Sequence, residues 1–411
     1  MAAVQKPERW LIINSLTGGG AERQALLLLN QQVFDKIILL EQNVDYKDID
    51  VSKIVFLTNK TATKGPLLVL TSLFAQYKQL RQLISYRDNN SRPLQIVSML
   101  FRADLLNFIC SRFLSYPFIS SFRSSITGFP KKSIQYIGWK WILRHSTRVL
   151  PNSNHCADEL VELGFCSREQ IRVIQNGYDI PLIHTQAGLN NVLLLKDKKY
   201  FLAAGRLGNE KGYFFLISVF AHFVQTVRKD IGLIICGAGP LMQPLIDYAT
   251  LQQLTVSTGD DFTAMKNIHF AGFQKNIYPL LHKAELFIMS SIFEGIPNVV
   301  AESLICGTPV VCSANKGTVE LLAPNNAAPV SAEKITTPLQ VEGGYLMPLV
   351  EADRPANPSE LDTWVKTLQQ ALASSSDSAR QTRFASITNR LSAENCAAGW
   401  TKVLDELATH Y

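Results

Sequence analysis

The chain has 411 residues, which exceeds what a single hydrophobic core usually organises, so two or three domains are expected. Hydrophobic residues make up 47% of the chain and charged residues 18%, a composition that excludes a disordered protein. Lys and Arg exceed Asp and Glu by 40 to 34, and this weak basic excess would suit phosphates or an anionic membrane surface.

The cysteines and the apolar runs bear on the cellular compartment. The seven cysteines are scattered without a C-x-x-C pair, which argues against a disulfide framework or a zinc site and predicts reduced, mostly buried thiols. No apolar run reaches the roughly 18–20 residues that span a bilayer, and residues 1–9 are too polar for a signal peptide. These features predict a cytoplasmic protein.

The first part of the chain alternates short β-type runs with helical patterns. Strands are predicted at 10–13, 36–40, 53–57 and 94–99, and helices at 21–32 and 66–86. Gly18, Gly19 and Gly20 break the chain between the first strand and its helix. Such a loop lets the backbone approach a phosphate, although a tight strand-to-helix turn explains the same glycines.

Two features of the next segment suggest ligand or membrane contact. A strand from 117 runs into a polar loop with Arg123, at the strand end where an α/β sheet usually binds its ligand; a surface arginine is the alternative. From 131 to 150 basic residues interleave with Tyr136, Trp139 and Trp141, which is typical of helices at a lipid interface. A solvated helix with a core-facing aromatic stripe is the rival interpretation.

A second alternating series follows an irregular stretch at 180–197, which we interpret as a domain linker. Strands are predicted at 200–204, 231–236, 267–270, 286–289 and 310–312, with helices between them. Strands that alternate with helices indicate a second doubly wound parallel sheet. The tail from 359 reads as helices and ends in a helix at 393–407.

The stretch 293–312 concentrates features of a binding site. Pro297 suits the first position of a helix, Gly307 suits its end, and Glu294 lies in the loop before it. Glu302 lies on the second turn of that helix, so two carboxylates would flank a helix N-terminus that attracts an anion. A phosphate between two hydroxyl-binding carboxylates suggests a nucleotide sugar.

A glycine-rich loop at 204–212 carries Arg206 and Lys211 directly after the first strand of the second series. The guanidinium can take phosphate oxygens in bidentate fashion and the ammonium adds a mobile charge, so the pair would fit a diphosphate. Taken alone, the two residues would be interpreted as surface cations. Gly237 and Gly239 end the next strand and predict a close backbone turn near the ligand.

Together these motifs resemble the group 1 (family-four) retaining glycosyltransferases. The matching segments are Gly205-Arg206-Leu207 with Lys211-Gly212, Gly237-Ala238-Gly239-Pro240, Glu294-Gly295-Ile296-Pro297-Asn298 with Glu302, and Cys306-Gly307-Thr308-Pro309-Val310-Val311. They cover nearly all of the second domain. In the first domain, 18–23 and 173–179 resemble segments of bacterial members that build surface polysaccharides and lipid-linked glycans.

The resemblance implies the GT-B architecture, an α/β fold of two Rossmann-like, doubly wound parallel-sheet domains that face a cleft. Residues 1–180 would bind the acceptor, 198–385 would bind the nucleotide sugar, and a helix at 386–411 would cross back to the first domain. The resemblance further implies catalysis without a metal or another cofactor.

Residue roles follow from the same resemblance. Arg206 and Lys211 would neutralise the donor diphosphate and Glu294 would hold hydroxyls of the transferred sugar, which makes these three the catalytic set. Donor-binding positions are Gly205, Gly239, Phe273, Gly295, Ile296, Pro297, Asn298, Val299 and Glu302, with Glu302 on the ribose. The acceptor or phosphate loop would include Gly19, Gly20 and Arg123, and Arg123 stands where many members carry a histidine.

The sequence therefore predicts a retaining glycosyltransferase for hexosyl or N-acetylhexosaminyl groups. The donor would be a nucleotide diphosphate sugar, UDP-linked, and the acceptor a lipid-linked, lipopolysaccharide or capsular glycan at the inner face of the plasma membrane. No nucleic-acid partner is expected. Alternatives are transfer to a soluble sugar, a glycosidase that uses Glu294 and Glu302 as acid and base, or a non-catalytic sugar-nucleotide-binding module.

Overall fold

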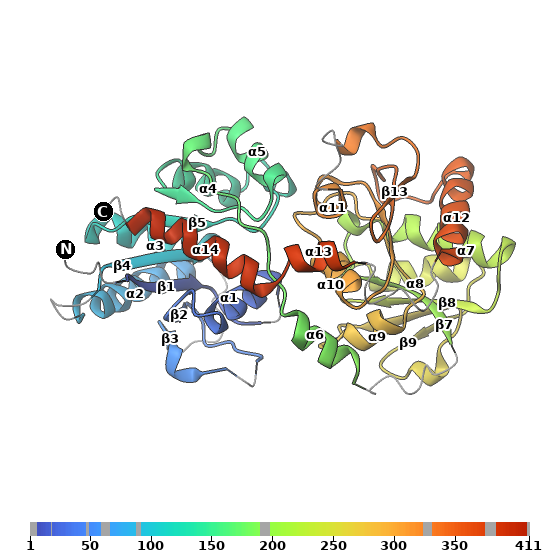
Figure 1. Cartoon of the computed structure of the whole chain (residues 1–411), viewed down its shortest axis with the longest axis horizontal. Coiled ribbons are helices and arrows are strands. Elements are labelled where there is room, and N and C mark those ends of the chain that lie inside the picture. Colours follow the sequence, from blue (N-terminus) through green and yellow to red (C-terminus); the bar gives the residue numbers. More distant parts are fainter. Residues whose placement is uncertain are drawn as a thin grey trace. The chain divides into compact units, whose positions relative to one another are not determined.

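A computed structural model describes residues 6–17, 19–46, 49–58, 66–87, 92–189, 198–323, 331–374 and 384–408 (Figure 1). The chain divides into two compact units. The first unit combines 1–177 with 392–411, and the second unit is 178–391. Each unit is built on one sheet.

The first unit contains a six-stranded parallel sheet in the order β3-β2-β1-β4-β5-β6. Its strands are β1 (Glu8–Ile13), β2 (Lys36–Leu39), β3 (Ile54–Phe56), β4 (Leu94–Met99), β5 (Phe118–Ser121) and β6 (Arg148–Val149). Its α-helices are α1 (Gly20–Asn30), α2 (Pro66–Ser85), α3 (Phe101–Leu114), α4 (Ile134–Arg144), α5 (Asn154–Glu162) and α14 (Ala393–Ala408). The strand order reverses between β1 and β4, so the loops after these strands adjoin a topological switch point.

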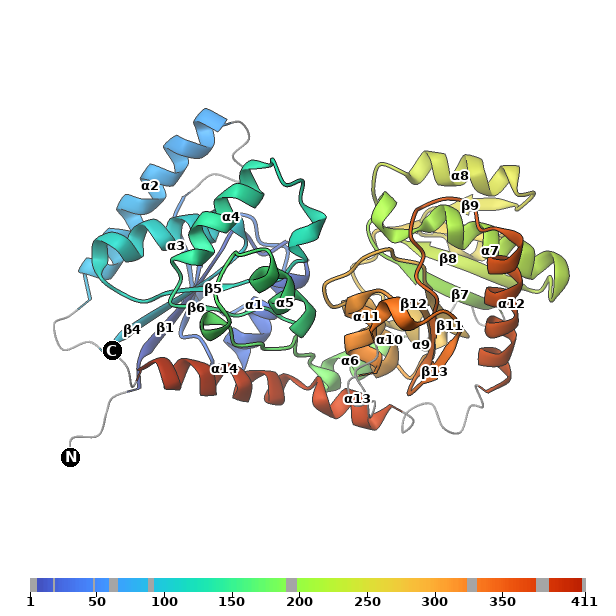
Figure 2. The ribbon, with the colours of Figure 1, turned by 90° about the horizontal axis from the view of Figure 1, so that it is seen from above.

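Helices cover both faces of this sheet because its central strands are apolar on both sides. Leu11 and Ile13 of β1 pack with α1 and α14, and the views show α14 (red) along this sheet (Figure 2). On that face Trp400 meets Phe34 edge-on, with ring centroids 5.6 Å apart. Trp10 and Ile12 point to the opposite face and pack with α2 and α3. The alternation of these four residues fixes the register of β1.

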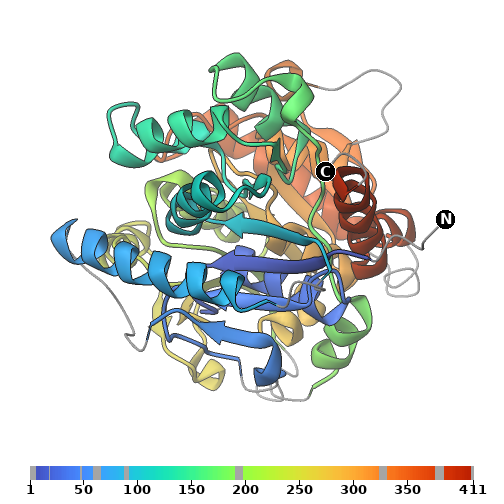
Figure 3. The ribbon, with the colours of Figure 1, turned by 90° about the vertical axis from the view of Figure 1, so that its left-hand side faces the viewer.

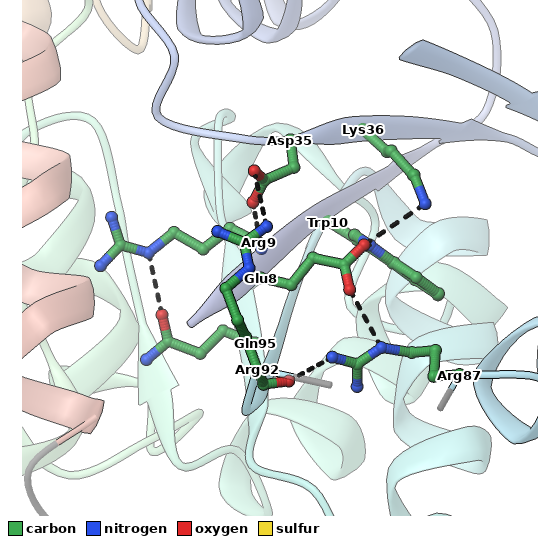
Figure 4. Close-up of polar contacts among 8 residues, drawn as sticks. All are labelled: Glu8, Arg9, Trp10, Asp35, Lys36, Arg87, Arg92 and Gln95. Carbon is green, nitrogen blue, oxygen red and sulfur yellow. Dashed lines mark hydrogen bonds and ion pairs between the residues drawn. The ribbon is translucent and has the colours of Figure 1, made fainter. Parts of the chain in front are cut away.

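A polar cluster at the amino-terminal end of β1 includes Arg9 and Gln95 (Figure 4), and both residues also bond to the last helix. Arg9 is fully buried; its Nε donates to Gln95 Oε1 at 3.0 Å and its Nη2 to Asp405 Oδ1 at 2.5 Å. Gln95 Nε2 donates in turn to the carbonyl of Leu404 at 2.7 Å. Residues nearly four hundred positions apart in sequence are therefore part of one core.

The second unit contains an eight-stranded sheet in the order β13-β14-β12-β11-β7-β8-β10-β9, in which only the β13–β14 pair is antiparallel. Its strands are β7 (Lys199–Ala204), β8 (Ile231–Cys236), β9 (Val256–Thr258), β10 (Ile268–Gly272), β11 (Leu286–Met289), β12 (Val310–Ser313), β13 (Leu339–Val341) and β14 (Gly344–Met347). Its α-helices are α6 (Ile180–Ala187), α7 (Tyr213–Thr226), α8 (Met242–Leu251), α9 (Tyr278–Lys283), α10 (Asn298–Ile305), α11 (Lys316–Leu322), α12 (Pro358–Ala373) and α13 (Ala385–Arg390).

These observations confirm the predicted fold class of two parallel-sheet α/β domains. The buried thiols are also as predicted, since all seven cysteines are free and buried. Part of the stretch expected as a linker is instead helix α6, because the Asp179 side chain accepts from Leu182 N at 3.0 Å and caps its first turn. Residues 190–197 of that stretch lie outside the described residues. Within the described ranges, no helix is long and apolar enough to cross a membrane.

Candidate functional site

The candidate site lies at the carboxyl edge of the second-unit sheet, around β7. This strand pairs with β8 on one side and β11 on the other, so the loops after β7 and β11 are neighbours. The first of these loops carries Arg206 and Lys211, and the second carries Glu294. In open α/β sheets, ligands bind at such a point, where the strand order reverses.

The structure brings Lys211 and Glu294 together. Lys211 Nζ lies 2.5 Å from Glu294 Oε1, and the two side chains are 20% and 14% exposed. The backbones of the two loops are also joined, because Ile292 N donates to the carbonyl of Glu210 at 2.9 Å and Ser290 Oγ to that of Gly212 at 2.7 Å. The cation and the carboxylate are therefore held by their loops and remain partly accessible to solvent.

Glycines make this close approach of loops possible. Gly212 has a positive φ of 66°, and a Cβ there would lie 2.4 Å from the carbonyl oxygen of Ser290. A Cβ on Gly237 would lie 1.9 Å from the carbonyl oxygen of Gly205, and one on Gly239 would lie 2.4 Å from that of Leu207. Real Cβ atoms do not approach backbone this closely, so the loops after β7 and β8 require glycine at these positions.

The loop with Glu294 is supported from below by residues that the sequence did not single out. Asn315 Nδ2 donates to the carbonyl of Ser291 at 3.1 Å, while its Oδ1 caps α11 by accepting from Thr318 N at 3.0 Å. Gly317 lies so close to this loop that a Cβ would be 1.7 Å from the carbonyl oxygen of Gly295. An Asn directly before a helix is an N-cap signal, but nothing in the sequence indicates that it also holds a distant loop.

Helix α10 begins one residue later than predicted. Pro297 has an extended backbone (φ −75°, ψ 95°) and is the N-cap, so Asn298 is the first helical residue. The Asn298 Oδ1 accepts from the Tyr178 hydroxyl at 2.7 Å. Ile296 is buried and Val299 partly buried, while Glu302 lies on the second turn and is only 4% exposed.

Other predicted donor positions surround this pair at the same edge. Arg206 is exposed and lies in the same loop as Lys211. Phe273 follows β10 and is 61% exposed, although its neighbour Gln274 is fixed by donation from Nε2 to the carbonyl of Ala271 at 2.6 Å. A solvent-exposed aromatic ring on an ordered loop can stack against a flat ligand.

Tyr213 supports the β7 loop from the first turn of α7. Burial raises the pKa of this phenol well above its usual range, with Cys236 and Glu294 adding to the shift, so the hydroxyl stays protonated. It donates to the carbonyl of Gly205 at 3.3 Å. This bond holds the backbone of the β7 loop in place next to Arg206.

The acceptor-side loop of the first unit is described only in part, since Gly18 lies outside the described residues. Gly19 is the N-cap of α1 with extended backbone (φ −76°), and α1 begins at Gly20. One turn later, Gln24 forms two hydrogen bonds with Gly177, donating to its carbonyl at 2.6 Å and accepting from its N–H at 2.9 Å.

Arg123 is engaged within the first unit. Its Nε donates to Ser121 Oγ at 2.8 Å and its Nη1 to Asn176 Oδ1 at 2.7 Å. The guanidinium lies over the ring of Trp400, 5.4 Å from its centroid. The structure therefore places Arg123 between β5, the segment that ends the first unit and helix α14.

Segment 131–150 contains both buried and exposed apolar side chains. Tyr136 and Trp139 of α4 are buried, as the core-facing stripe requires. Ile134, Ile137 and Trp141 of the same helix are exposed.

Comparison with known proteins agrees with the geometry. Residues 189–336, which include β7, β11, α10 and their loops, match the family model of glycosyl transferases group 1. The chain is 27% identical over 315 residues to the Campylobacter jejuni N-acetylgalactosamine-N,N'-diacetylbacillosaminyl-diphospho-undecaprenol 4-alpha-N-acetylgalactosaminyltransferase, covering 74% of this chain and 80% of that protein. It is 24% identical over 194 residues to the Escherichia coli UDP-Gal:alpha-D-GlcNAc-diphosphoundecaprenol alpha-1,3-galactosyltransferase, covering 44% of this chain and 47% of that one.

Similarity in structure extends over both units. The crystal structure of Anabaena HepE in complex with UDP-glucose matches with a TM-score of 0.66 at 18% identity and covers 97% of this chain and 99% of that one. At this identity the likeness establishes the fold, while the family model identifies the segment that carries the candidate site. The chain has the GT-B fold, and its residues 189–336 match the group 1 glycosyltransferases.

Proposed function

We propose that the chain transfers a hexosyl or N-acetylhexosaminyl group from a UDP-linked sugar to a lipid-linked, lipopolysaccharide or capsular glycan. The transfer would retain the configuration at the anomeric carbon of the sugar. The observation that carries this proposal is the Lys211–Glu294 ion pair at the switch point around β7, next to the start of α10. The printed activities of the Campylobacter and Escherichia relatives on undecaprenol-linked glycans support the acceptor class. The UDP-glucose bound by HepE supports the donor class.

Positive charge is what this reaction needs. Departure of a nucleoside diphosphate builds negative charge, which Arg206, Lys211 and the first-turn N–H groups of α10 would stabilise without a metal or another cofactor. Donor binding would replace the carboxylate of Glu294 by a diphosphate oxygen at Lys211 Nζ. Glu294 would then accept from hydroxyls of the transferred sugar, and Glu302 from those of the ribose.

The remaining donor contacts would come from the loops around this pair. Phe273 would lie against the base, and the backbone from Gly295 to Val299 would meet the phosphates, with Gly205 and Gly239 allowing close approach. Gly19, Gly20 and Arg123 stay the proposed acceptor-side residues. The enzyme would work at the inner face of the plasma membrane as a peripheral protein.

A thermal-shift panel of UDP-, GDP-, ADP- and TDP-sugars tests the donor. A true donor raises Tm by mass action, with about 2.7 kcal/mol of stabilisation at one hundred times Kd. Release of nucleoside diphosphate with undecaprenol-linked glycan, compared with free sugars, tests the acceptor. No shift with any nucleotide sugar would contradict the proposal, and a free sugar used as efficiently as the lipid-linked glycan would contradict its membrane part.

A further inference from the structure

Exposed apolar side chains gather on three helices of the first unit. Among the described residues of this unit, eight large apolar side chains are exposed, and six of them lie on α2, α3 and α4 or directly after α2. They are Phe74, Tyr86, Phe113, Ile134, Ile137 and Trp141. Single exposed apolar residues need no explanation, but a cluster on neighbouring helices marks an interaction surface.

The three helices that carry these side chains are packed against one another. Helix α3 lies between α2 and α4 and contacts both (Figure 3). Phe113 of α3 meets Tyr77 of α2 edge-on with ring centroids 5.9 Å apart, and Phe108 of α3 meets Trp141 of α4 at 4.8 Å. We call the six exposed apolar residues, together with the exposed cations among them, the α2–α4 surface.

The apolar side chains of this surface are exposed although the inner faces of the same helices are packed against the first unit. The inner side of α4 is fully packed, with Trp139 and Leu143 buried, while Ile134 is 83% exposed and Ile137 58%. Phe113 is 71% exposed although Cys110, one turn earlier on α3, is fully buried. Each helix therefore has an apolar inner face against the unit and a second apolar set that faces outward.

A shallow groove runs along the outer face of α2. Its volume is about 500 Å³, and it is lined by aromatic side chains, including Phe74 and Tyr86, together with Lys78 and Arg81. Lys78 Nζ lies 4.6 Å from the centroid of the Phe74 ring. Positions 74, 78 and 81 recur at helical spacing, so they share one side of α2. Aromatic rings beside cationic side chains match the boundary between acyl chains and phosphate headgroups.

Charge is concentrated in the same part of the chain. Residues 66–157 contain 12 Lys and Arg but only two acids, Asp88 and Asp104, whereas the rest of the chain has 28 basic and 32 acidic residues. Asp104 is buried and Asp88 lies outside the described residues. The net charge of +6 therefore comes from this segment alone.

The cations of the surface are exposed to solvent. They are Lys78, Arg81, Arg112, Lys131 and Lys132. None of them forms an ion pair with another residue in the ranges that the structure describes. They are available to an anionic partner.

We propose that the α2–α4 surface docks on a lipid bilayer with anionic headgroups. Ile134, Ile137 and Trp141 enter the headgroup boundary, while Lys131 and Lys132 meet lipid phosphates. This proposal rests on the proposed function, because it places the protein on the membrane that would hold a lipid-linked acceptor. A second copy of the chain fits less well, since two copies of this surface would bring like charges together.

The test is flotation of the purified protein with vesicles, without donor or acceptor. We expect binding to vesicles of phosphatidylglycerol and phosphatidylcholine in equal parts, weak binding to phosphatidylcholine alone, and loss of binding at high salt. K131Q/K132Q should lower the partition coefficient about 25-fold, at roughly fivefold for each charge. I134S/I137S should lower it at least tenfold, because two aliphatic side chains no longer enter the bilayer.

Matched controls change equally exposed residues elsewhere. L251S removes an apolar side chain that is 75% exposed on α8, and K366Q/K402Q removes two exposed lysines from α12 and α14; both should float like the parent. Binding that the α4 variants leave unchanged would overturn the proposal. Concentration-dependent dimers that disappear in I134S/I137S, with no vesicle binding, would overturn it in favour of self-association.

The same variants separate this inference from the proposed function. Their thermal shift with the preferred nucleotide sugar should equal that of the parent, because α4 lies in the first unit and the donor residues in the second. Variants that no longer float with vesicles but keep the thermal shift with the donor would support membrane docking by the α2–α4 surface. A parent that binds vesicles but no nucleotide sugar would contradict the function and leave the surface supported.

Discussion

Polar side chains at the carboxyl edges of the two sheets have different environments. In the second unit, Lys211 and Glu294 bond to each other at 2.5 Å and both keep partial exposure. In the first unit, Asp104 at the start of α3 is buried, and accepts from Ser98 Oγ at 2.7 Å and from Trp139 Nε1 at 3.1 Å. Arg123 is likewise committed to Ser121 and Asn176.

The difference separates residues available to a ligand from residues that hold a unit together. A partly exposed ion pair can exchange partners with a bound anion at little cost, because water already competes for both charges. A buried carboxyl between two donors cannot, since moving it leaves unpaired polar groups. Substitutions in the second unit should therefore affect activity first, and those in the first unit should affect stability first.

The largest expected effect is on activity. Lys211→Ala removes the cation beside Glu294 and should lower kcat/KM for the donor by about 100–1000-fold, as loss of one preorganised charge-stabilising group does. Steady-state kinetics at limiting donor checks this. The control is Lys366→Ala, an exposed lysine on α12 that should leave kcat/KM unchanged. Wild-type activity in Lys211→Ala would show that this loop does not contact the diphosphate.

The next effect is a pH dependence of stability in the first unit. Burial raises the pKa of the Asp104 carboxyl to about 7, although Ser98 and Trp139 donate to it. The folded-state pKa of Asp104 lies above the unfolded value. The contribution of its protonated carboxyl to stability is therefore fully present below about pH 4 and is lost as pH rises through 7. Over that window the free energy of unfolding should fall by roughly 3–4 kcal/mol on account of this group.

Urea unfolding of the parent and of Asp104→Asn across this pH range checks that slope. An asparagine amide can donate to Ser98 Oγ and accept from Trp139 Nε1, but it does not titrate. The difference in free energy of unfolding between the two proteins should therefore grow as pH rises. Parallel pH profiles would mean that Asp104 is ionised in the folded protein throughout. The donor thermal shift should not depend on this substitution.

A smaller effect concerns the support of the Glu294 loop. A Cβ at Gly317 would lie within 3 Å of three backbone atoms of Glu294 and Gly295, none of which can rotate away. Gly317→Ala should destabilise the protein by about 1–3 kcal/mol and weaken donor binding, because the loop must shift. In Gly188→Ala the nearest atom is 3.6 Å away and φ is −75°, so stability should hardly change. Equal melting temperatures for both variants would contradict this account.

Most of the second unit could be predicted from local patterns. Strands at 231–236 and 286–289 coincide with β8 and β11, because buried parallel strands are short apolar runs with clear ends. That Lys211 and Glu294 lie close together could also be predicted, because they follow β7 and β11, which end at the same edge of the sheet. Strands β9 and β13 were missed, since three-residue strands at the sheet margin carry little apolar periodicity.

The supporting contacts could not be predicted, because they join residues far apart in sequence. Asn315 bonds to Ser291, Tyr178 to Asn298 and Gln24 to Gly177, and each partner alone has ordinary local reasons for its residue type. The environment of Arg123 belongs to the same class. Its partner Asn176 is 53 positions away, and Trp400 approaches from the last helix of the chain.

Arg123 gives an effect of similar size and the sharpest test of the difference between the units. Arg123→Met should lower the free energy of unfolding by roughly 2 kcal/mol, because two hydrogen bonds from a charged group and the contact with Trp400 disappear. Arg123→Lys should recover little, since an ammonium cannot bond Ser121 and Asn176 in the fork geometry of a guanidinium. Urea unfolding and hydrogen exchange of the α14 amides measure both.

Activity then decides whether Arg123 also serves the acceptor. If its role is structural, both variants should keep the donor thermal shift and, below their melting temperatures, the KM for acceptor. A raised acceptor KM with unchanged stability would instead assign Arg123 to the acceptor, and the contrast between the two sheet edges would then fail at this residue. Arg123 is well suited to this test because its guanidinium is half-buried, at a strand end where a ligand could still reach it.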